Sequence, residues 1–536
     1  MSFLKQFRQL FSTKKKDERA LFDELKKQFT RDHDLVFVGE LLQLAYKKYP
    51  DQIALICRDK SITYKEFYLR SLLLSKKFAS QGIGLRDHVI LYSENSIEFY
   101  IAYFAIWQCG AIVAPINIFL HEKELAHILD DAHPKAIFTQ KIHQEKLENL
   151  INQGLIKQLP TLFTEQDIDW LTLVPKSIED AYPDFTIAIL TSDELCLLLY
   201  TSGTTGSPKG VMLSSRNIMT NTLQGHARFL ISGQNAQERF LCVLPLFHVF
   251  AQNSCLWLPI MTGSTIIVVS KIDRKLILEG LENKPTLFFG FPALYGLLCL
   301  MKTAPLDSIK LFVSGADMLP DRIRSAFAMV YGRKICSGYG LTEASPVVAI
   351  HYHNEEQATN VVGFPMADLE CQVRDDEGKI LKTGQIGTLW IRGDNVMLGY
   401  YKVPDATTRV LQNGWLNTGD LVSIDKAGMI TITGRSKDLI IHKGFNIYPQ
   451  EIENVLLKHP AVFKAAVVGR DEVLSGQIPV AYVAVRSGHK NVEEGLRELC
   501  AHNLAAYKIP RKFICLEDLP MNATGKVDKK QLNSGT

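Results

Sequence analysis

Short apolar runs alternate with helix-like segments along most of this 536-residue chain, and this alternation limits the folds that the chain can adopt. Buried strands are expected at 88–93, 111–117, 264–270 and 309–316, and helices at 97–108 and 274–282. Apolar strands connected by helices are typical of a layered α/β fold, in which helices cover a mostly parallel sheet. The sequence therefore predicts a large layered α/β domain in the N-terminal part of the chain.

The pattern changes at about residue 365. Up to about residue 435 the strand signals are short and alternating, with Gly and Asp turns between them, which predicts a small β-rich subdomain. From Ser436 onward a helix, two strands and a second helix are expected, a pattern typical of a compact α+β domain. We therefore divide the chain into a basic amphipathic N-terminal extension (1–30), a large domain (31–435) and a C-terminal domain (436–536).

Composition excludes several classes of protein. The net charge of +3 is too small to predict a nucleic-acid partner. The ten cysteines are scattered singly, which is typical of a reducing compartment and not of a disulfide or zinc framework. One apolar run, 99–116, reaches the lower length limit of a membrane span, but Gln108, Cys109 and Gly110 interrupt it. It predicts a buried helix, a glycine turn and a buried strand, and we expect a cytoplasmic protein.

The segment "YTSGTTGSPKG" (200–210) follows an apolar run that predicts a buried strand. Its glycines let backbone N–H groups approach an anion closely, its hydroxyls add donors, and its lysine adds a positive charge. In a Walker A loop the lysine directly follows the second glycine, which is not the case here. We expect a phosphate-binding loop of another kind, formed by Thr201, Ser202, Gly203, Thr204, Thr205, Gly206 and Lys209.

This segment resembles the signature of the AMP-forming acyl-adenylating superfamily, which includes acyl-CoA synthetases, luciferases and the adenylation domains of peptide synthetases. Further stretches match the motifs of that superfamily in order, over roughly 42–530: "LPLFHVFAQ", "SGADMLP", "GYGLTEASP", "GTLWIRGDNVMLGYY", "GWLNTGD", "GRSKDLIIHKGFNIYPQEIE" and "LPMNATGKVDKK". Of these stretches, "LPLFHVFAQ" and "GYGLTEASP" are most similar to long-chain fatty-acid–CoA ligases and acyl-carrier-protein synthetases. The resemblance implies that an acid attacks ATP to give an acyl-adenylate and pyrophosphate, and that a thiol then attacks the adenylate.

The resemblance also implies roles for residues of the matching motifs. The loop at 201–209 would hold the phosphates of the leaving pyrophosphate, Thr342 would contact the α-phosphate, and Glu343 would ligate Mg²⁺. Tyr339 would stack on adenine, Asp420 would accept hydrogen bonds from the ribose, and Arg435 would lie in the ribose and phosphate region. The implied nucleotide-binding set is completed by Gly315, Ala316, Asp317 and Gly340.

Four more residues are expected to act with the acid or the thiol. Lys526 matches the catalytic lysine of adenylation, and Lys437 matches the hinge about which a mobile C-terminal domain rotates between the two half-reactions. Gly444 would line the pantetheine tunnel. His248 is either a contact near the acyl site or a core histidine, because a lone histidine is compatible with both. Taken without the resemblance, Lys526 is a solvated lysine of a basic tail and Gly444 an ordinary turn glycine.

The acid and the thiol acceptor are less closely specified. The segment "PLFHVFAQN" has no carboxylate to pair with the amino group of an amino acid, and the apolar segments 253–263 and 288–301 suit a tunnel for a fatty acid or a plain core. CoA and acyl carrier protein present the same phosphopantetheine arm, so both stay open as acceptors. The basic residues of the first sixteen and of 507–512 suit an acidic carrier protein.

Two further points stay open. The N-terminal extension would lie on an anionic membrane at the inner face, which supplies fatty acid, or remain solvated. As alternatives to a ligase we consider a luciferase-like adenylate oxygenase and a non-catalytic protein that binds nucleotide or fatty acid.

Overall fold

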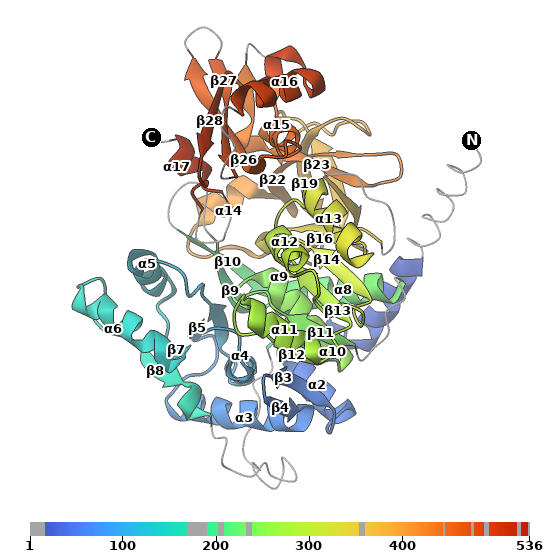
Figure 1. Cartoon of the computed structure of the whole chain (residues 1–536). Helices are drawn as coiled ribbons and strands as arrows, with labels where there is room; N and C mark the ends of the chain where they lie inside the picture. Colours follow the sequence, from blue (N-terminus) through green and yellow to red (C-terminus); the bar gives the residue numbers. More distant parts are fainter. Residues whose placement is uncertain are drawn as a thin grey trace.

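The computed structural model describes residues 17–168, 190–201, 208–231, 238–352, 360–442, 445–472, 476–486, 492–521 and 527–533. Within these residues the strands form a seven-stranded, a fourteen-stranded and a five-stranded sheet, besides a short two-stranded ribbon of β1 (Thr30–Arg31) and β2 (Asp34–Leu35). The seven-stranded sheet lies in the lower part of Figure 1, and the five-stranded sheet lies at the top. This arrangement is the mixed α/β fold expected from the sequence.

The seven-stranded sheet holds the strand that leads into the glycine-rich segment. Its order is β20 (Gly399–Tyr400), β10 (Lys209–Ser214), β9 (Leu195–Thr201), β6 (Ile112–Pro115), β5 (His88–Tyr92), β7 (Ala136–Thr139) and β8 (Thr161–Thr164). The strands β5 to β9 run parallel, whereas β10 is antiparallel to β9. Along the chain these strands are separated by α4 (Ile97–Gln108), α5 (Glu122–Ala132) and α6 (Gln144–Asn152).

The helix α4 accounts for the apolar run at 99–116. All of its residues except Glu98 are buried, as expected for a helix that is hydrophobic on every side. It packs against α3 (Tyr64–Ser80), and Gln108 Nε2 donates to Ser71 Oγ at 2.9 Å. The turn at Gly110, with a φ of 80°, then leads into β6. In the described part of the chain no helix combines the length and apolarity that crossing a bilayer requires.

The fourteen-stranded sheet has a parallel half and an antiparallel half. The parallel half consists of β3 (Ile53–Cys57), β12 (Thr265–Val268), β11 (Arg239–Cys242), β13 (Leu287–Gly290), β14 (Leu311–Ser314) and β15 (Cys336–Gly340), with β4 (Lys60–Thr63) at the edge. Its helices include α2 (Leu41–Lys48), α8 (Ser215–Ile231), α9 (Val249–Gln252), α10 (Leu258–Thr262), α11 (Arg274–Glu282), α12 (Pro292–Met301) and α13 (Asp321–Tyr331). The antiparallel half continues from β15 without a break in the hydrogen bonding.

That antiparallel half contains the strands of the predicted β-rich subdomain. The order after β15 is β16 (Val347–Ile350), β17 (Val361–Pro365), β23 (Ile430–Arg435), β22 (Trp415–Ile424), β19 (Gly387–Arg392) and β18 (Glu370–Arg374), while β21 (Leu411–Gln412) pairs with β22 and precedes it after α14 (Pro404–Val410). Because β17 pairs with both β16 and β23, these strands extend the sheet of the large domain and do not form a sheet of their own.

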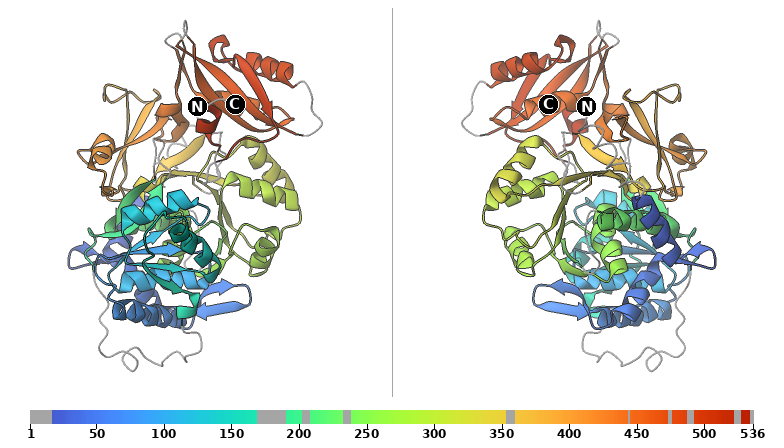
Figure 2. Two further views of the ribbon diagram at one scale, coloured as in Figure 1. Left: turned by 90° about the vertical axis from the view of Figure 1, so that its left-hand side faces the viewer. Right: turned by 90° about the vertical axis from the view of Figure 1, so that its right-hand side faces the viewer.

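The C-terminal part folds around its own sheet. Its strands are β24 (Ile440–His442), β25 (Phe445–Ile447), β26 (Val462–Glu472), β27 (Gly476–Val485) and β28 (Lys512–Leu516), and its helices are α15 (Pro449–Leu456), α16 (Glu493–Asn503) and α17 (Lys529–Asn533). In both views of Figure 2 this part, in red, caps one end of the molecule. It contacts the large domain through Arg322 Nη1, which donates to Val462 O at 2.9 Å, and through Asn454 Nδ2, which donates to Asn360 Oδ1 at 3.3 Å.

Part of the predicted N-terminal extension belongs to the folded body. Residues 17–28 form a helix, and its apolar side chains Phe22 and Leu25 are buried in the main hydrophobic core. The basic residues before Asp17 lie outside the described residues. The helix therefore packs against the large domain, although it lies within the range that the sequence assigned to an extension.

Candidate active site

The glycine-rich segment is carried by a β-hairpin of the seven-stranded sheet. Its arms are β9 and β10, in which Thr201 lies opposite Lys209, and Thr201 Oγ1 donates to Lys209 O at 3.5 Å. The predicted phosphate-binding residues between the arms, Ser202, Gly203, Thr204, Thr205 and Gly206, lie outside the described residues. This pairing fixes the facing ends of the two strands, and Lys209 is the first residue of β10.

A tyrosine of β20 connects this hairpin to the predicted metal ligand. Lys209 Nζ lies 5.4 Å from the centre of the Tyr400 ring, and Tyr400 OH donates to Glu343 Oε1 at 2.8 Å. Burial, and next to it the charge of Glu343, raises the pKa of Tyr400, so its hydroxyl stays protonated and remains a donor at neutral pH. The structure thus brings Lys209 and Glu343 together through a residue to which the sequence assigned no role.

The backbone around Glu343 is held as well. Glu343 lies with Thr342 in a 3₁₀ turn (Thr342–Ala344) directly after β15, and its carbonyl oxygen accepts a hydrogen bond from Met397 N at 2.9 Å. Gly340 precedes this turn, and a Cβ atom there would lie 2.2 Å from the carbonyl oxygen of Pro346. Only glycine fits that close approach of two backbone segments.

A second polar group surrounds Asp420, which is 5% exposed. Tyr339 OH donates to Asp420 Oδ2 at 2.5 Å, and Arg435 Nε lies 3.1 Å from Asp420 Oδ1. The pairing of β22 with β23 places Asp420 opposite Arg435. The charge of Asp420 raises the pKa of Arg435, to which Tyr339 and Glu343 also contribute, while burial and Asp420 raise the pKa of Tyr339. Arg435 therefore lies within electrostatic reach of both polar groups.

The remaining predicted nucleotide contacts follow the end of a neighbouring strand. Because β14 pairs with β15 in parallel, Gly315, Ala316 and Asp317 emerge at the same edge of the sheet as Tyr339. Gly315 is buried against the ring of Phe250, and a Cβ atom there would lie 3.2 Å from that ring. Ala316 and Asp317 are exposed, and Ala316 has a left-handed φ of 67°.

The residues predicted to act with the acid or the thiol are placed only in part. His248 precedes α9, and its ring packs against Phe247 with 4.5 Å between ring centres. Lys437 follows Arg435 in a 3₁₀ turn (Ser436–Asp438). Desolvation lowers the pKa of Lys437, and the neighbouring charges of Arg435 and Lys530 act in the same direction, although Asp438 and Asp420 oppose them. Gly444 and Lys526 lie outside the described residues.

The end of the chain nevertheless lies close to the predicted nucleotide site. Lys529, three residues after Lys526, forms an ion pair of 2.7 Å with Glu453. Burial lowers the pKa of Lys529, but Glu453, Asp438 and Asp317 outweigh this effect and raise it. Asp317 of the large domain is thus within electrostatic reach of the segment that follows Lys526.

The helix α8 contains a set of residues that the sequence did not point to. Four polar side chains spaced four, three and four residues apart share one face of this helix, and all four are buried: Asn217, Asn221, Gln224 and Arg228. The side-chain amide of Asn221 binds both backbone polar groups of Val347: its Nδ2 donates to Val347 O at 2.8 Å, and its Oδ1 accepts from Val347 N at 3.0 Å. The signal in the sequence is the regular spacing of amide side chains, which is also typical of a solvent-facing stripe.

Glu343 is suited to hold Mg²⁺. Its carboxylate oxygens are ligands of the kind that Mg²⁺ prefers, and Mg²⁺ is usually bound by one or two carboxylates together with phosphate oxygens of a substrate. Tyr400 fixes the orientation of this carboxylate on the side of the hairpin that carries Lys209. Glu343 would therefore hold the metal ion, which would neutralise charge on the phosphates of a substrate.

Comparison with known proteins gives one consistent result. The chain matches the family model described as AMP-binding enzyme over residues 42–401 and the model of the AMP-binding enzyme C-terminal domain over 451–526. The protein named long-chain-fatty-acid–CoA ligase of Escherichia coli O157:H7 is 30% identical, with 92% of this chain and 93% of the relative covered. The protein of the same name from Bacillus subtilis (strain 168) is 31% identical, with 93% and 95% covered.

A solved structure shares the fold over nearly the whole chain. It is o-succinylbenzoate CoA synthetase (MenE) from Bacillus subtilis in complex with the acyl-adenylate intermediate OSB-AMP, which has a TM-score of 0.81, is 26% identical, and covers 93% of this chain and 98% of its own. The same protein has been solved with ATP and a magnesium ion, with a TM-score of 0.81, 26% identity, and 92% and 99% covered.

Proposed function

Because this chain belongs to the AMP-binding enzyme family, we propose that it joins a long-chain fatty acid to the phosphopantetheine thiol of CoA, using ATP and Mg²⁺. The convergence of Lys209, Tyr400 and Glu343 beside the glycine-rich hairpin carries this proposal, because it combines a phosphate-binding loop with a carboxylate suited to Mg²⁺. The relatives of about 30% identity that are named long-chain-fatty-acid–CoA ligases support the choice of acid and thiol.

The nucleotide would bind at the edge of the fourteen-stranded sheet. Tyr339 is fixed by its hydrogen bond to Asp420, so its ring is held ready to stack on adenine. Asp420 is held between Tyr339 and Arg435, which fixes its carboxylate where ribose hydroxyls would donate. The backbone of 315–317 and Gly340 would complete this part of the site.

In the first half-reaction a carboxylate oxygen of the acid attacks the α-phosphorus of ATP, and the bond from this phosphorus to the bridging oxygen of the leaving pyrophosphate breaks. The N–H groups of residues 202–206 and the ammonium of Lys209 would hold the pyrophosphate, and Thr342 would donate to an α-phosphate oxygen. Glu343 would hold Mg²⁺, which neutralises charge on the phosphates when it is bound. Lys526 would bridge the oxygens of the acid and of ATP.

In the second half-reaction the thiol sulfur attacks the acyl carbon of the adenylate, its proton is released, and AMP leaves. We propose that the C-terminal domain, beginning at Ser436, rotates about Lys437 between the two steps. Gly444 would then line the passage of the pantetheine arm. The proposed rotation is supported by the C-terminal part having its own sheet and its own hydrophobic core between residues 440 and 533. A unit with its own core can move as one body.

A fatty acid suits the side chains beneath Gly315. The ring of Phe250 packs against Gly315 and, at 6.3 Å between ring centres, against Phe289. Phe289 in turn packs against Phe229 at 5.7 Å and stacks on Phe240 at 6.0 Å. An aromatic surface of this kind favours an aliphatic chain over a charged or amino acid substrate. His248 stays a proposed neighbour of the acyl group.

One ion pair favours CoA over acyl carrier protein as the acceptor. The basic segment 507–512 would have to attract an acidic carrier protein, but Lys508 already forms an ion pair of 2.7 Å with Glu451. This pairing reduces the positive charge that the segment offers to a partner. We therefore propose CoA as the main acceptor and retain acyl carrier protein as the second.

The proposal is tested by measuring AMP and thioester formation from ATP, Mg²⁺ and palmitate, with CoA and separately with holo acyl carrier protein. We expect AMP, pyrophosphate and palmitoyl-CoA in equal amounts, and loss of all three in the Glu343→Gln variant. Thioester on the carrier protein alone would reverse the choice of acceptor. AMP with oxygen consumption and no thioester would favour an adenylate oxygenase, and nucleotide binding without turnover for any acid would favour a binding protein.

A further inference from the structure

The helix at residues 17–28 and the polar face of α8 hold the same parts of the molecule from two sides. On α8 the stripe of Asn217, Asn221, Gln224 and Arg228 is buried, and a buried polar side chain is costly unless it finds partners. The partners of this stripe are backbone oxygens of irregular segments and strand ends. The N-terminal helix supplies charged side chains to the same segments.

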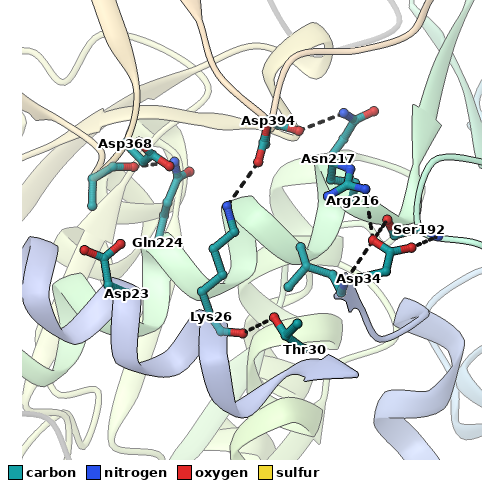
Figure 3. A network of polar contacts seen from close by, with 12 residues as sticks. Asp23, Lys26, Thr30, Asp34, Ser192, Arg216, Asn217, Gln224, Asp368 and Asp394 are labelled. Atoms are coloured by element: carbon teal, nitrogen blue, oxygen red, sulfur yellow. Dashed lines mark hydrogen bonds and ion pairs between the residues drawn. The ribbon is translucent and has the colours of Figure 1, made fainter. Parts of the chain in front are cut away.

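The contact at Asp394 shows this arrangement most clearly. Lys26 Nζ donates to Asp394 Oδ2 at 3.2 Å, and Asn217 Nδ2 donates to Asp394 O at 2.8 Å. In Figure 3 the two side chains reach Asp394 from different helices, Lys26 from the N-terminal helix and Asn217 from α8. Both the side chain and the backbone of Asp394 are thus anchored.

Two further contacts repeat the pattern along the helices. Arg19 Nη1 donates to Asp368 Oδ1 at 2.6 Å, and Gln224 Nε2 donates to the preceding carbonyl, Ala367 O, at 2.5 Å. At the end of the series Glu18 and Arg228 pair directly, with 2.9 Å between Oε2 and Nε. From the first contact to the third, the residue numbers fall on the N-terminal helix (Lys26, Arg19, Glu18) and rise on α8 (Asn217, Gln224, Arg228). The two series of contacts therefore run in opposite directions along the chain.

The last contact is the most buried of the three. Glu18 and Arg228 are each 2% exposed, and Tyr352 OH donates to Glu18 Oε2 at 2.7 Å. Arg228 also donates through Nη2 to Pro365 O at 2.9 Å, at the end of β17. A buried charge pair with further hydrogen bonds holds its members in one geometry, so the N-terminal helix is fixed in its position along α8.

The segment anchored at Asp394 leads directly to the predicted metal ligand. Asn217 Nδ2 also donates to Val396 O at 2.8 Å, and Asn395 Nδ2 donates to Ala344 O at 2.9 Å. Met397, which follows Val396, donates through its backbone N to Glu343 O, and Tyr400 lies three residues after Met397. Residues 393–398 form neither helix nor strand, so they are held by these side-chain anchors together with a few backbone hydrogen bonds, among them Leu398 N to Met212 O at 3.0 Å.

We propose that the helix at 17–28 positions the Mg²⁺·ATP site, with Lys26 as the positioning residue that acts on Glu343 through residues 394–397 and Arg19 as a second anchor that holds the same helix at Asp368. The proposal rests on the proposed function in so far as Glu343 binds Mg²⁺·ATP. The helix precedes residue 42, where the match to the family model begins, and therefore adds to this site a support that lies outside the matched region. Loosening the helix lets residues 394–397 shift, and the carboxylate of Glu343 shifts with them.

The test uses the full chain with two matched double variants. Arg19→Gln/Lys26→Gln removes two positive charges that hold the loops, whereas Lys27→Gln/Lys47→Gln removes two positive charges at exposed positions. Calorimetry measures the binding of ATP with and without Mg²⁺. We expect Mg²⁺·ATP to bind about threefold more weakly to the first variant, because Lys26 and Arg19 form partly exposed ion pairs, which make small contributions, and act on Glu343 only indirectly. The second variant should bind like the parent chain.

Two readouts separate positioning from a general loss of structure. Hydrogen–deuterium exchange without ligands should be faster at residues 393–400 in Arg19→Gln/Lys26→Gln, with the melting temperature close to that of the control variant. The charge-conserving variant Arg19→Lys/Lys26→Arg should restore Mg²⁺·ATP binding. For the buried contact, Glu18→Gln should weaken Mg²⁺·ATP binding more than metal-free ATP binding.

Equal binding of Mg²⁺·ATP by the two double variants would overturn the proposal, as would an equal loss of metal-free ATP binding. The outcome is independent of the acid. If the parent chain binds Mg²⁺·ATP but forms no adenylate with any fatty acid, the proposed substrate is wrong, whereas the positioning role is still decided by the binding data.

Discussion

Replacing Tyr400 by Phe tests the arrangement at the centre of the proposed site. The variant keeps the ring beside Lys209 and removes only the hydroxyl that donates to Glu343 at 2.8 Å. A hydrogen bond to a charged group contributes about 1.5–3 kcal/mol. Because Glu343 is only partly buried, water replaces some of this interaction, and we take the lower end of the range. A loss of about 1.4 kcal/mol corresponds to a factor of about ten.

The expected result is an increase of about tenfold in the Mg²⁺ concentration that half-saturates ATP–pyrophosphate exchange, measured at saturating ATP and acid. Tyr401→Phe, one residue further on, serves as the control and should leave this concentration unchanged. Burial and the charge of Glu343 raise the pKa of Tyr400, so in the parent chain the hydroxyl stays protonated through the alkaline range. The exchange rate should therefore show no fall from ionisation of Tyr400 between pH 7 and its ordinary pKa of about 10.

An unchanged Mg²⁺ requirement in Tyr400→Phe would refute the reasoning, because Glu343 would then not depend on this hydrogen bond for its orientation. A large fall in melting temperature would refute it as well, since it would show that the hydroxyl mainly stabilises the fold. In contrast, a higher Mg²⁺ requirement with an unchanged melting temperature would be the result that the geometry predicts.

Three further predictions concern other parts of the chain. Lys526→Ala should lower acid-dependent pyrophosphate release by orders of magnitude while thioester formation from added acyl-adenylate largely survives; an equal loss in both assays would contradict the proposed rotation of the C-terminal domain. Gly340→Ala should abolish adenylation with secondary structure retained in circular dichroism, because its Cβ would lie 2.2 Å from Pro346 O, and normal activity would show that this backbone segment can move. Burial lowers the pKa of His226 to about 4, so the folded state resists protonation of this side chain, and the free energy of unfolding should fall by about 3 kcal/mol as the pH drops from about 6.5 to about 4. His226→Gln should reduce this pH dependence of the free energy of unfolding, measured in denaturant titrations. An unchanged pH dependence in the variant would assign the effect to other groups.

Much of the fold could be predicted from the sequence because its strands are buried on both faces. The strands β5, β6, β12 and β14 lie within the apolar runs that predicted them, and α4 and α11 span the expected ranges 97–108 and 274–282. Such runs are read correctly because burial alone determines their composition. The extent of the fourteen-stranded sheet could not be read in this way, because which strand pairs with β17 depends on segments far apart in the sequence.

In the candidate site, too, residues of local motifs could be predicted from the sequence, whereas a contact between distant segments could not. The motif residues Lys209, Glu343 and Asp420 could be singled out because glycine, hydroxyl and charged residues are unusual in dense local clusters. Tyr400, which joins two of these motifs, could not be identified, since a tyrosine beside a second tyrosine carries no local sign of its hydrogen-bond partner. The separation of 57 residues between Tyr400 and Glu343 is closed by tertiary contacts, namely the pairing of β20 with β10 and the hydrogen bond from Met397 N to Glu343 O.

The polar stripe of α8 shows why the support behind the site was missed. Its other faces also bury residues, among them Ile218, Met219 and Leu223, so this helix has both an apolar and a polar buried surface. By periodicity alone, Asn217 and Gln224 are indistinguishable from residues of a helix that faces water. What decides the difference is which segments cover the face, and these are distant in the sequence: backbone oxygens between residues 347 and 396 accept its hydrogen bonds, and Glu18, more than two hundred residues earlier, pairs with Arg228. A polar face with regular spacing that contains amides and arginine but no lysine or acid is therefore a reason to look for a covering segment before treating the face as solvated.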